Sequence, residues 1–294
     1  MLHFSRNFRH GSILGITLLV SGCTSQPTAV SDARASVRVA PAASACIDAI
    51  AGDDAMHHSQ LDADAIRVVN WNMQKGGHPD WADDLDTLHD ETDILILQEA
   101  SPDLDAWNRL APTHHRSFAQ GFQGFGRNTG VMTLSAAAPV AECDLVAREP
   151  WLRTRKAMLV TEYGLAGTES TLLVINIHGV NFSLGMRELK RQIEAAEHII
   201  AAHNGPVLFS GDFNTWRAGR TTLIHETVSG LGLEALEYDA DYRKRFLGWP
   251  LDHIYVRGLD AVTATTHDVD SSDHNPMLVE FRLAPDARVK LAHQ

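Results

Sequence analysis

Short apolar segments that end in polar residues constrain the fold of this sequence more than any other feature. Residues 66–70 and 93–98 are the first two such segments, and their length and apolar character are typical of buried β-strands. Helices are predicted over 81–89 and, as the longest, over 183–203. Further strands are predicted over 131–134, 157–163, 171–177, 207–210, 254–256 and 277–281. This alternation of strands and helices beyond residue 65 indicates an α/β fold.

The composition sets limits on the class of protein. The chain has 294 residues, of which 44% are apolar, which is enough to bury a large core and excludes disorder throughout. Its 37 acidic and 25 basic side chains give a net charge of −12, which disfavours a protein held on nucleic acid mainly by sequence-independent charge. An acidic nuclease that brings its own cation remains compatible with this charge. The three cysteines lack the paired spacing of a zinc ribbon, so no structural zinc is expected.

The N-terminus has the three parts of a secretory signal peptide. Arg6 and Arg9 precede an apolar run over 13–20, which is too short to span a bilayer, and Ser-Gly-Cys follows at 21–23. The string Val-Ser-Gly-Cys at 20–23 resembles a bacterial lipobox, which predicts a signal peptide over 1–22 and lipidation of Cys23. The alternative, a buried N-terminal helix, fits the charged start and the abrupt stop less well. We therefore expect an exported protein, anchored through Cys23 to a membrane of the bacterial cell envelope and facing the periplasm.

The remainder of the chain divides into a linker, a domain and a short tail. Residues 23–64 are rich in Ala, Ser, Asp and Pro without a sustained period, which predicts a flexible tether. The folded domain is predicted over 65–283 and a C-terminal tail over 284–294. Cys46 lies in the tether and Cys143 in the domain. The two could form a disulfide in an oxidising compartment, and their spacing leaves that question open.

Polar residues stand at five ends of the predicted strands, where α/β enzymes usually place their reactive groups. They are Asn-Trp-Asn at 70–72, Leu-Gln-Glu at 97–99, Asn-Ile-His at 176–178, Gly-Asp-Phe-Asn at 211–214 and Ser-Asp-His-Asn-Pro at 272–276. Each motif alone is weak, because acids and Asn-rich turns at strand ends are common. Their order along the chain, with helices between them, is far more specific.

Together the motifs resemble those of the endonuclease/exonuclease/phosphatase superfamily, whose members are metal-dependent phosphoesterases. The resemblance covers residues 65–283. Segments 180–185, 211–216 and 272–276 are similar to the bacterial YafD-like branch in particular. The resemblance implies a four-layer α/β sandwich, in which two mixed β-sheets pack face to face with helices outside. It also implies one phosphoesterase site where the strand ends converge, in a chain that we expect to be a monomer.

Metal ligands are the first group of predicted site residues. Phosphoester hydrolysis needs a cation to offset charge on the phosphoryl oxygens, and Mg²⁺ prefers carboxylate and amide oxygens. By resemblance, Glu99 is the leading ligand, Asn72 lies beside it, and Asp273 is an acid near the metal or the phosphate. Glu99 closes an apolar strand, which is a poor position for a solvent-facing residue, whereas a turn-capping role is a real alternative for Asp273. Mg²⁺ is the expected cofactor, with Mn²⁺ as a substitute.

His274 is the predicted general base, because imidazole titrates close to neutral pH and can accept a proton from water. In the family, the aspartate at the position of Asp252 holds the second nitrogen of the catalytic histidine. His253 is the neighbour of Asp252, and side chains alternate along a strand, so the two cannot both face the site. The resemblance therefore assigns the inward position to Asp252.

Three further residues are predicted to act on water and phosphate. Asp212 and Asn214 are two positions apart and can share one face. The resemblance assigns Asp212 to the attacking water or a second metal, and Asn214 to a phosphate oxygen; an ordinary tight turn is the alternative. His178 matches the histidine with which DNase I-like and sphingomyelinase members stabilise phosphoryl oxygens. Abasic-site enzymes commonly have tyrosine there, so His178 argues against DNA base repair.

Loops supply weaker candidates for substrate contact. Two basic clusters could grip phosphates, although such clusters are more often merely solvated. They are Arg243, Lys244 and Arg245, and Arg153, Arg155 and Lys156. Lipid-cleaving members need an exposed apolar loop beside the site. The best candidate, residues 118–125, has three phenylalanines and lacks a flanking basic run.

These predictions favour an exported, magnesium-dependent phosphodiesterase with nucleic acid as the first substrate class. Cleavage of phospholipid or sphingomyelin is the alternative within the same chemistry, and a membrane tether would suit it. A catalytically silent surface protein that binds through this fold is the third hypothesis. The predicted base, its orienting acid and the metal ligands are all present, which disfavours silence.

Overall fold

The computed structural model describes residues 41–50, 59–124, 127–150, 152, 154–181, 183 and 185–289. The chain divides into two units, Met1–Arg38 and Val39–Gln294, and every described residue belongs to the second unit. The predicted signal peptide, Cys23 and Arg153 lie outside the described residues. Within the described part, no helix is both long enough and apolar enough to cross a membrane.

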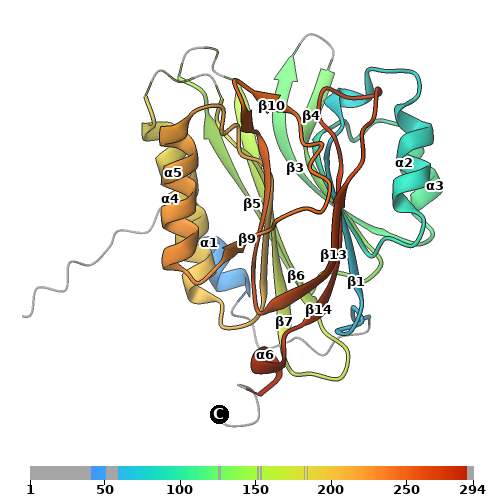
Figure 1. The fold of residues 1–294 in the computed structure, drawn as a ribbon, viewed down its shortest axis with the longest axis vertical. Helices are drawn as coiled ribbons and strands as arrows, with labels where there is room; N and C mark the ends of the chain where they lie inside the picture. Colours follow the sequence, from blue (N-terminus) through green and yellow to red (C-terminus); the bar gives the residue numbers. More distant parts are fainter. Residues whose placement is uncertain are drawn as a thin grey trace, which may run out of the picture. The chain divides into compact units, whose positions relative to one another are not determined.

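Two six-stranded β-sheets form the centre of the domain (Figure 1). The first has the strand order β13-β14-β1-β2-β4-β3. Its strands are β1 (Ile66–Asn72), β2 (Ile94–Ala100), β3 (His115–Gly124), β4 (Arg127–Ser135), β13 (Leu259–Thr266) and β14 (Met277–Leu283). The neighbours β1 and β2 run parallel, and the other neighbours are antiparallel, so the sheet is mixed.

The second sheet is mixed in the same way, with the order β5-β6-β7-β8-β12-β9. Its strands are β5 (Ala141–Arg148), β6 (Arg155–Gly164), β7 (Thr171–His178), β8 (Val207–Asp212), β9 (Glu234–Ala235) and β12 (Asp252–Arg257). Here β7 and β8 are the parallel pair. The short strands β10 (Arg245–Phe246) and β11 (Trp249–Pro250) form a separate hairpin just before β12.

Helices cover the outer face of each sheet. The second sheet packs against α1 (Pro41–Ile50), α4 (Arg187–Ala202) and α5 (Ala218–Gly230), and the first against α2 (Trp81–His89) and α3 (Ala106–Leu110). Figure 1 shows the two groups of helices on opposite flanks of the sheets. The remaining elements are the 3-10 turn η1 (Gln74–Gly76) and α6 (Pro285–Val289). The expected four-layer α/β sandwich is therefore confirmed.

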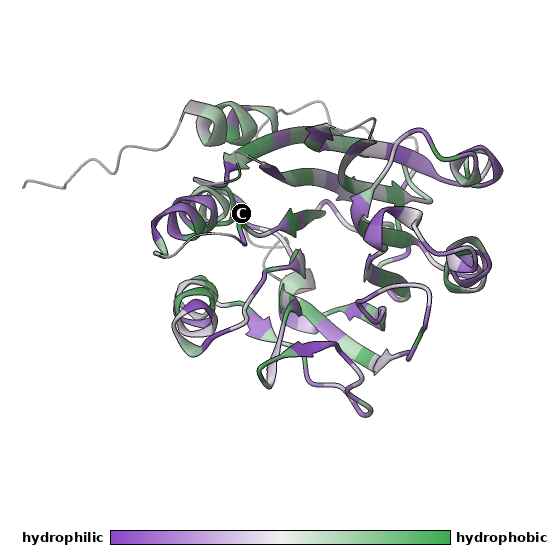
Figure 2. Ribbon diagram, turned by 90° about the horizontal axis from the view of Figure 1, so that it is seen from above, coloured by the Kyte–Doolittle hydropathy of each residue, from purple (hydrophilic) through white to green (hydrophobic). Residues whose placement is uncertain are grey.

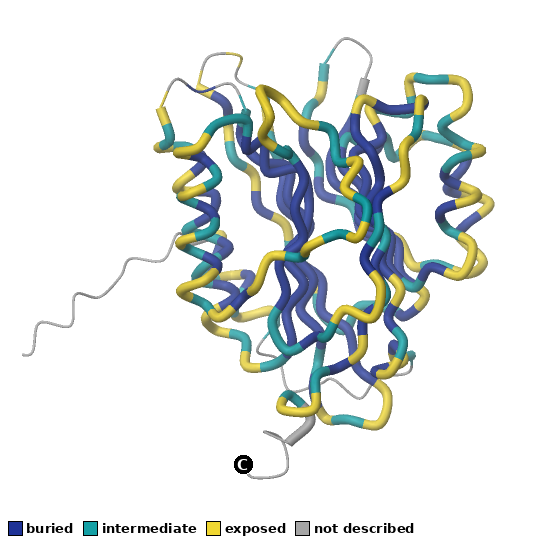
Figure 3. Tube along the Cα trace, viewed as in Figure 1, coloured by how far each residue is buried: buried dark blue, intermediate teal, exposed yellow. Residues whose placement is uncertain are grey.

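The central strands are apolar on both faces because each face is covered. In β1, Val68 packs in the core between the sheets, whereas Val69 packs toward the helices. In β2, Ile96 packs in the core between the sheets and Leu95 packs toward the helices. Such strands are nearly continuous apolar runs, as those of covered sheets usually are. Figure 2 shows the hydrophobic residues concentrated on the strands, and Figure 3 shows the same strands as buried.

Part of the segment expected as a flexible tether, 23–64, belongs to the folded domain. Residues 41–50 form α1, whose Ala43 and Cys46 are buried in the core beneath the second sheet. Cys46 forms a disulfide with Cys143 of β5, with 5.5 Å between the two Cα atoms. Leu61 is also buried, in the core between the sheets. Small apolar side chains pack closely in this Ala-rich segment, and composition alone does not distinguish such a segment from a linker.

Candidate active site

The topology brings the predicted motifs to one edge of the sandwich. β1 and β2 are parallel neighbours, and so are β7 and β8, so the C-terminal ends of each pair lie together. The side chains near these ends also meet between the sheets. Gln98 Nε2 donates to Asn176 Oδ1 (2.8 Å) and to Asn70 Oδ1 (3.0 Å), and Ser210 Oγ donates to the same Asn70 oxygen (2.9 Å). This buried amide cluster fixes the two sheets against each other beneath the site.

The structure brings His274 and Asp252 into direct contact. His274 Nδ1 lies 2.7 Å from Asp252 Oδ2, and both side chains are buried. Asp252 is the first residue of β12, and His274 lies in the loop before β14. His253 points to the opposite face, where its Nε2 lies 2.7 Å from Thr215 Oγ1. Strand alternation thus separates the two neighbours, as expected, and only Asp252 faces His274.

Asp212 lies at the centre of the arrangement. Strand pairing places it between His178 of β7 and Asp252 of β12, and residues paired across strands share one face of the sheet. Asp212 Oδ2 lies 3.4 Å from His178 Nε2 and 3.9 Å from His274 Nε2. From the first sheet, Asn72 Nδ2 donates to the same Asp212 oxygen (3.1 Å). Residues from both sheets therefore converge on one carboxylate.

Burial and charge shift the pKa values of these groups. Burial raises the pKa of Asp212 to about 6. The charge of His274 opposes this shift, and the negative charge of Asp252 adds to it. Burial would lower the pKa of His274, but the negative charges of Asp252 and Asp212 outweigh it and raise that pKa to about 10. Burial, with Lys156 adding to it, holds the pKa of His178 well below 6.5. The two histidines of the site therefore differ in character, because His274 attracts a proton and His178 stays neutral.

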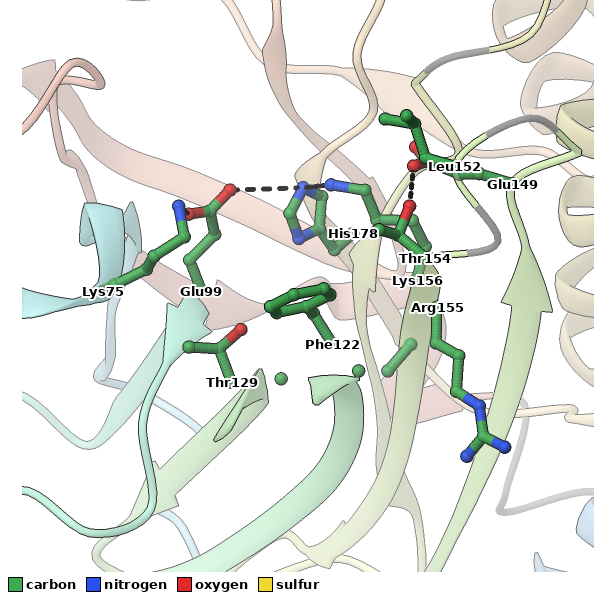
Figure 4. A pocket seen from close by; sticks show the side chains of 13 residues that line it. Lys75, Glu99, Phe122, Thr129, Glu149, Leu152, Thr154, Arg155, Lys156 and His178 are labelled. Carbon is green, nitrogen blue, oxygen red and sulfur yellow. Dashed lines mark hydrogen bonds and ion pairs between the residues drawn. The ribbon is translucent and has the colours of Figure 1, made fainter. Parts of the chain in front are cut away.

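Glu99 reaches the site through an irregularity in β2. The pairing of β2 with β4 shifts register between Gln98 and Ala100, and Glu99 between them has φ +53°. Such a bulge re-aims a side chain that would otherwise follow the strand. Glu99 Oε2 forms an ion pair with Lys75, which lies in η1 directly after β1, and Glu99 Oε1 lies 3.9 Å from His178 Nε2 (Figure 4).

Close backbone approaches hold the loop after β8. Gly211 has φ +148°, and a Cβ added there would lie 2.0 Å from the carbonyl oxygen of Ile177, so this position requires glycine. Asn214 has φ +53°, and its backbone N–H donates to Asp212 Oδ1 (2.9 Å). Its side-chain Nδ2 donates to the carbonyl oxygen of Gly179 (3.0 Å). Asn214 thus orients the Asp212 carboxylate, and one of its amide protons is engaged by the backbone.

Asp273 takes up a different position from the buried residues. Its side chain is exposed and makes no hydrogen bond or ion pair with the part of the chain that the structure describes. Its negative charge still contributes to the raised pKa of the adjacent His274.

The basic residues before Asp252 are largely matched by acids. Arg243 and Arg245 both pair with Asp241, and Lys244 lies 3.4 Å from Asp268. The Arg243 guanidinium also donates to the backbone oxygen of Asp252 (3.1 Å), which supports the start of β12. Lys244 and Asp268 are 24 residues apart, and pairing of this kind is not visible in the sequence pattern.

Two lysines lie at the site itself. Lys156 of β6 contacts His178 Nε2; burial lowers its pKa, and the charges of Asp212 and Glu99 oppose that shift. In the sequence, Lys156 was only a weak candidate on a loop. Lys75, the partner of Glu99, was not predicted, because a single lysine in a turn carries no signal beyond its place three residues after Asn72.

The oxygen donors at this edge fit a hard divalent cation. Glu99 and Asn72 offer carboxylate and amide oxygens, which are the ligands Mg²⁺ prefers. The ammonium group of Lys75 against Glu99 shows that positive charge is stabilised there. The ligand atoms of Asp212, Asp252 and His274 also lie within 4.8 Å of one another. However, Asp252 and His274 are bonded to each other, whereas Glu99 already binds a cationic group, so Glu99 and, on the neighbouring strand β1, Asn72 are the better candidates to hold a cation.

Known protein families contain close counterparts of this chain. The model of the Endonuclease/Exonuclease/phosphatase family matches residues 69–274. A UPF0294 protein from Vibrio campbellii is 37% identical over 226 residues, which are 76% of this chain and 80% of that protein. A UPF0294 protein from Yersinia enterocolitica is 40% identical over 221 residues, which are 74% of this chain and 84% of that protein.

Solved structures share the fold at low identity. An endonuclease/exonuclease/phosphatase from Beutenbergia cavernae superposes with a TM-score of 0.59 at 16% identity, over 75% of this chain and 72% of that chain. The catalytic domain of human Nocturnin gives a TM-score of 0.57 at 15% identity, over 77% of this chain and 97% of that chain. Members of the matched family are phosphoric ester hydrolases. The chain therefore belongs to the endonuclease/exonuclease/phosphatase family, and within it to the group of UPF0294 proteins.

Proposed function

We propose that this protein is an exported, divalent-metal-dependent phosphodiesterase that acts on nucleic acid. The observation that carries the proposal is the buried contact between His274 and Asp252, with Asp212 facing the other nitrogen of the same histidine at 3.9 Å. A histidine held by one carboxylate can take a proton from a bound water. Glu99, at the same edge, adds a carboxylate for the cation.

In the proposed reaction, His274 Nε2 removes a proton from the attacking water while Asp252 holds the Nδ1–H and stabilises the imidazolium. Asp212 accepts a hydrogen bond from that water and orients it. His178 and Lys156 stabilise the phosphoryl oxygens. A divalent cation held by Glu99 and Asn72 would offset the phosphoryl charge and, by its own charge, lower the pKa of His274 toward neutrality.

The bonds of this reaction balance without a further reactant. One phosphorus–oxygen bond forms to the water oxygen, and the bond from phosphorus to the leaving alkoxide breaks. The alkoxide takes up, through solvent, the proton that His274 removed from the attacking water, so His274 is neutral again and the products are a phosphomonoester and an alcohol.

One feature of the site supports nucleic acid as the substrate. Lys75 and Lys156 place positive charge within the site, where a phosphodiester would be bound. The chain as a whole carries a charge of −12, so affinity for a polyanion must come from these residues and the cation rather than from the general surface. Cleavage should therefore require the divalent cation and fall with added salt.

Phospholipid is the second candidate substrate, and one observation favours it. The β10–β11 hairpin exposes Phe246, Leu247 and Trp249 directly before Asp252, and Leu247 is 78% exposed. Exposed apolar side chains beside a site suit a substrate at a lipid interface. The segment that the sequence suggested for this role, 118–125, fits it less well, because Phe118 packs in part against the core.

Export and anchoring are also part of the proposal. The disulfide between Cys46 and Cys143 suits an oxidising compartment, which supports export. Mass spectrometry of the mature protein from a bacterial host should find a lipidated N-terminus at Cys23. The Cys23→Ser variant should remain an unlipidated precursor, and an unmodified wild-type start at another residue would overturn this part of the proposal.

A substrate panel tests the function. The full chain is incubated with DNA, RNA, phospholipid vesicles, sphingomyelin vesicles and inositol phosphates, with Mg²⁺ or with a chelator. Mg²⁺-dependent cleavage of DNA or RNA that falls with salt is expected. Faster cleavage of vesicle lipids would show that lipid, and not nucleic acid, is the substrate. No cleavage of any phosphodiester would indicate a protein that binds its ligand without catalysis.

A further inference from the structure

A pocket of about 220 Å³ opens beside Glu99 and His178 (Figure 4). One wall comes from the β3–β4 hairpin, with Phe122 and Thr129, and the other from β6, with Lys156. The pocket therefore lies between the two sheets, next to the position proposed for the scissile phosphate. Glu99, His178 and Lys156 of the proposed reaction line part of this pocket, whereas Phe122 and Thr129 have no part in that reaction.

The backbone of β3 turns Phe122 into the pocket. The pairing of β3 with β4 is regular up to Gln120 and resumes at Gln123, so Gly121 and Phe122 together oppose Thr129 alone. This is a β-bulge, which re-aims a side chain away from the regular strand. Gln120 Nε2 donates to the carbonyl oxygens of Phe122 (3.2 Å) and Thr129 (3.3 Å) and so braces the bulge. In Figure 4 the Phe122 ring points from the hairpin toward Glu99 and His178.

Small residues beside Phe122 form the floor of the pocket. They are Gly121, Gly130 and Ala157. A Cβ added at Gly121 would lie 3.1 Å from the backbone oxygen of Thr129, so the strands are already in contact beneath the cavity. The floor therefore carries little side chain, and Phe122 is the only phenylalanine, tyrosine or tryptophan among the lining residues, with the imidazole of His178 as a second ring.

The size and lining of the pocket select the class of group that it can hold. Its volume is below the roughly 300–1,000 Å³ of pockets that enclose drug-sized ligands, so it takes a small group rather than a long chain. An aromatic face next to lysine side chains suits a flat polar ring that is attached to an anion. In nucleic-acid sites, bases stack on such aromatic side chains without strong dependence on sequence.

We propose that this pocket receives the base of the nucleotide that carries the scissile phosphate, stacked on Phe122. The inference rests on the proposed function, because it places the phosphate at Glu99 and His178. It deepens that function by naming a nucleotide, rather than any phosphodiester, as the recognised unit. Phe122 is then a residue for specificity, with no part in proton transfer.

Binding in the presence of Mg²⁺ tests the inference apart from catalysis. Isothermal titration of the full-length protein compares thymidine 5′-phosphate with 2-deoxyribose 5-phosphate, which has the same sugar and phosphate but no base. Stacking of one base is worth a preference of about five- to a hundredfold for the nucleotide. The Phe122→Ala and Phe122→Leu variants should bring the two affinities to near equality, whereas Phe122→Trp should keep the preference. Tyr242→Ala is the control, because Tyr242 is an exposed aromatic side chain outside the pocket.

Each outcome bears on the inference separately from the proposed reaction. Equal affinity of the wild-type protein for the two ligands would overturn the base pocket, even if phosphodiesters are hydrolysed. A preference that survives in both Phe122→Ala and Phe122→Leu would also overturn it, because the base would then bind elsewhere. The protein could instead hydrolyse no phosphodiester, while the Phe122 variants lose the preference for the nucleotide. That result would support the base pocket and refute the proposed reaction. Thermal unfolding of each variant verifies that the fold is retained.

Discussion

Asp252→Asn removes the negative charge that faces His274 and keeps the size and shape of the side chain. Asparagine has the same size as aspartate and can still accept a hydrogen bond from His274 Nδ1, which lies 2.7 Å from the carboxylate. What the substitution removes is the negative charge that stabilises the protonated imidazole. The second oxygen of Asp252, Oδ1, is buried and has no hydrogen-bond partner among the described residues, so the carboxylate is directed mainly at His274.

The size of the effect follows from the geometry. Two unit charges about 4 Å apart at an effective dielectric constant near 20 interact by about 4 kcal/mol, and each pKa unit corresponds to about 1.4 kcal/mol. Loss of the Asp252 charge should therefore lower the pKa of His274, now about 10, by up to about three units. A base acts only when it is deprotonated, so the acidic limb of the rate profile should move to lower pH. The maximal rate should fall by about 10²- to 10⁴-fold, because the imidazolium loses its stabilising partner.

The assay is the pH dependence of kcat/KM for a soluble phosphodiester at saturating Mg²⁺. Asp260→Asn is the control, because Asp260 is an acid on β13 that pairs with Arg282 at the surface. The control should reproduce the wild-type profile. If Asp252→Asn also leaves both the rate and the acidic limb unchanged, Asp252 has no part in the mechanism and the role given to His274 loses its support.

Three predictions concern stability. Gly211→Ala should lower the free energy of unfolding by about 3 kcal/mol in urea denaturation, because its Cβ would lie 2.0 Å from a backbone oxygen; a loss near zero would contradict the close approach. Burial lowers the pKa of His253 to about 3, and the positive charges of Arg243 and His225 add to this shift. Below pH 6.5 the unfolded chain therefore binds a proton that the folded protein does not, so the folded protein loses stability as the pH falls toward 3. At about pH 4.5 this loss is about 3 kcal/mol, and His253→Gln should flatten the dependence of unfolding on pH between neutrality and that point; an unchanged slope would refute it. Cys46→Ser should lower the stability by about 2–4 kcal/mol, because the disulfide to Cys143 closes a loop with a sequence separation of 97, and equal melting temperatures would argue against the bridge.

The sequence predicted the central strands and missed strands at the edges. β1, β2, β7 and β8 are covered on both faces, so they appear in the sequence as nearly continuous apolar runs. β3, β13 and β5 are edge strands of their sheets and were not predicted. In β5, exposed or half-exposed residues occupy seven of the eight positions, and only Leu145 is buried. A strand that is open to solvent on one face and along one edge carries little of the apolar signal on which the prediction depends.

The predictability of the site residues depended on their position in regular structure. Asp252 and Asp212 were identified through the resemblance of their motifs to the family, and the regular pairing of β8 with β12 places them side by side. Phe122 is turned into its pocket by a bulge, and Lys75 lies in a turn with φ +66°. Irregular backbone of this kind aims side chains in directions that no sequence period encodes.

Hydrolysis of a soluble phosphodiester before and after removal of divalent cations tests most directly whether these strand ends form a metal-dependent phosphodiesterase. Bis(p-nitrophenyl) phosphate is a suitable probe, with the full-length wild type, Glu99→Gln and His253→Gln measured side by side. The wild type should be active with Mg²⁺, lose activity with a chelator and regain it when Mg²⁺ is restored. Glu99→Gln should require far more Mg²⁺ and lose about 10²-fold or more in rate, while His253→Gln, on the opposite face of β12, should resemble the wild type. Activity that persists in the chelator, or a Glu99→Gln variant with wild-type turnover and Mg²⁺ dependence, would contradict the assignment of the site.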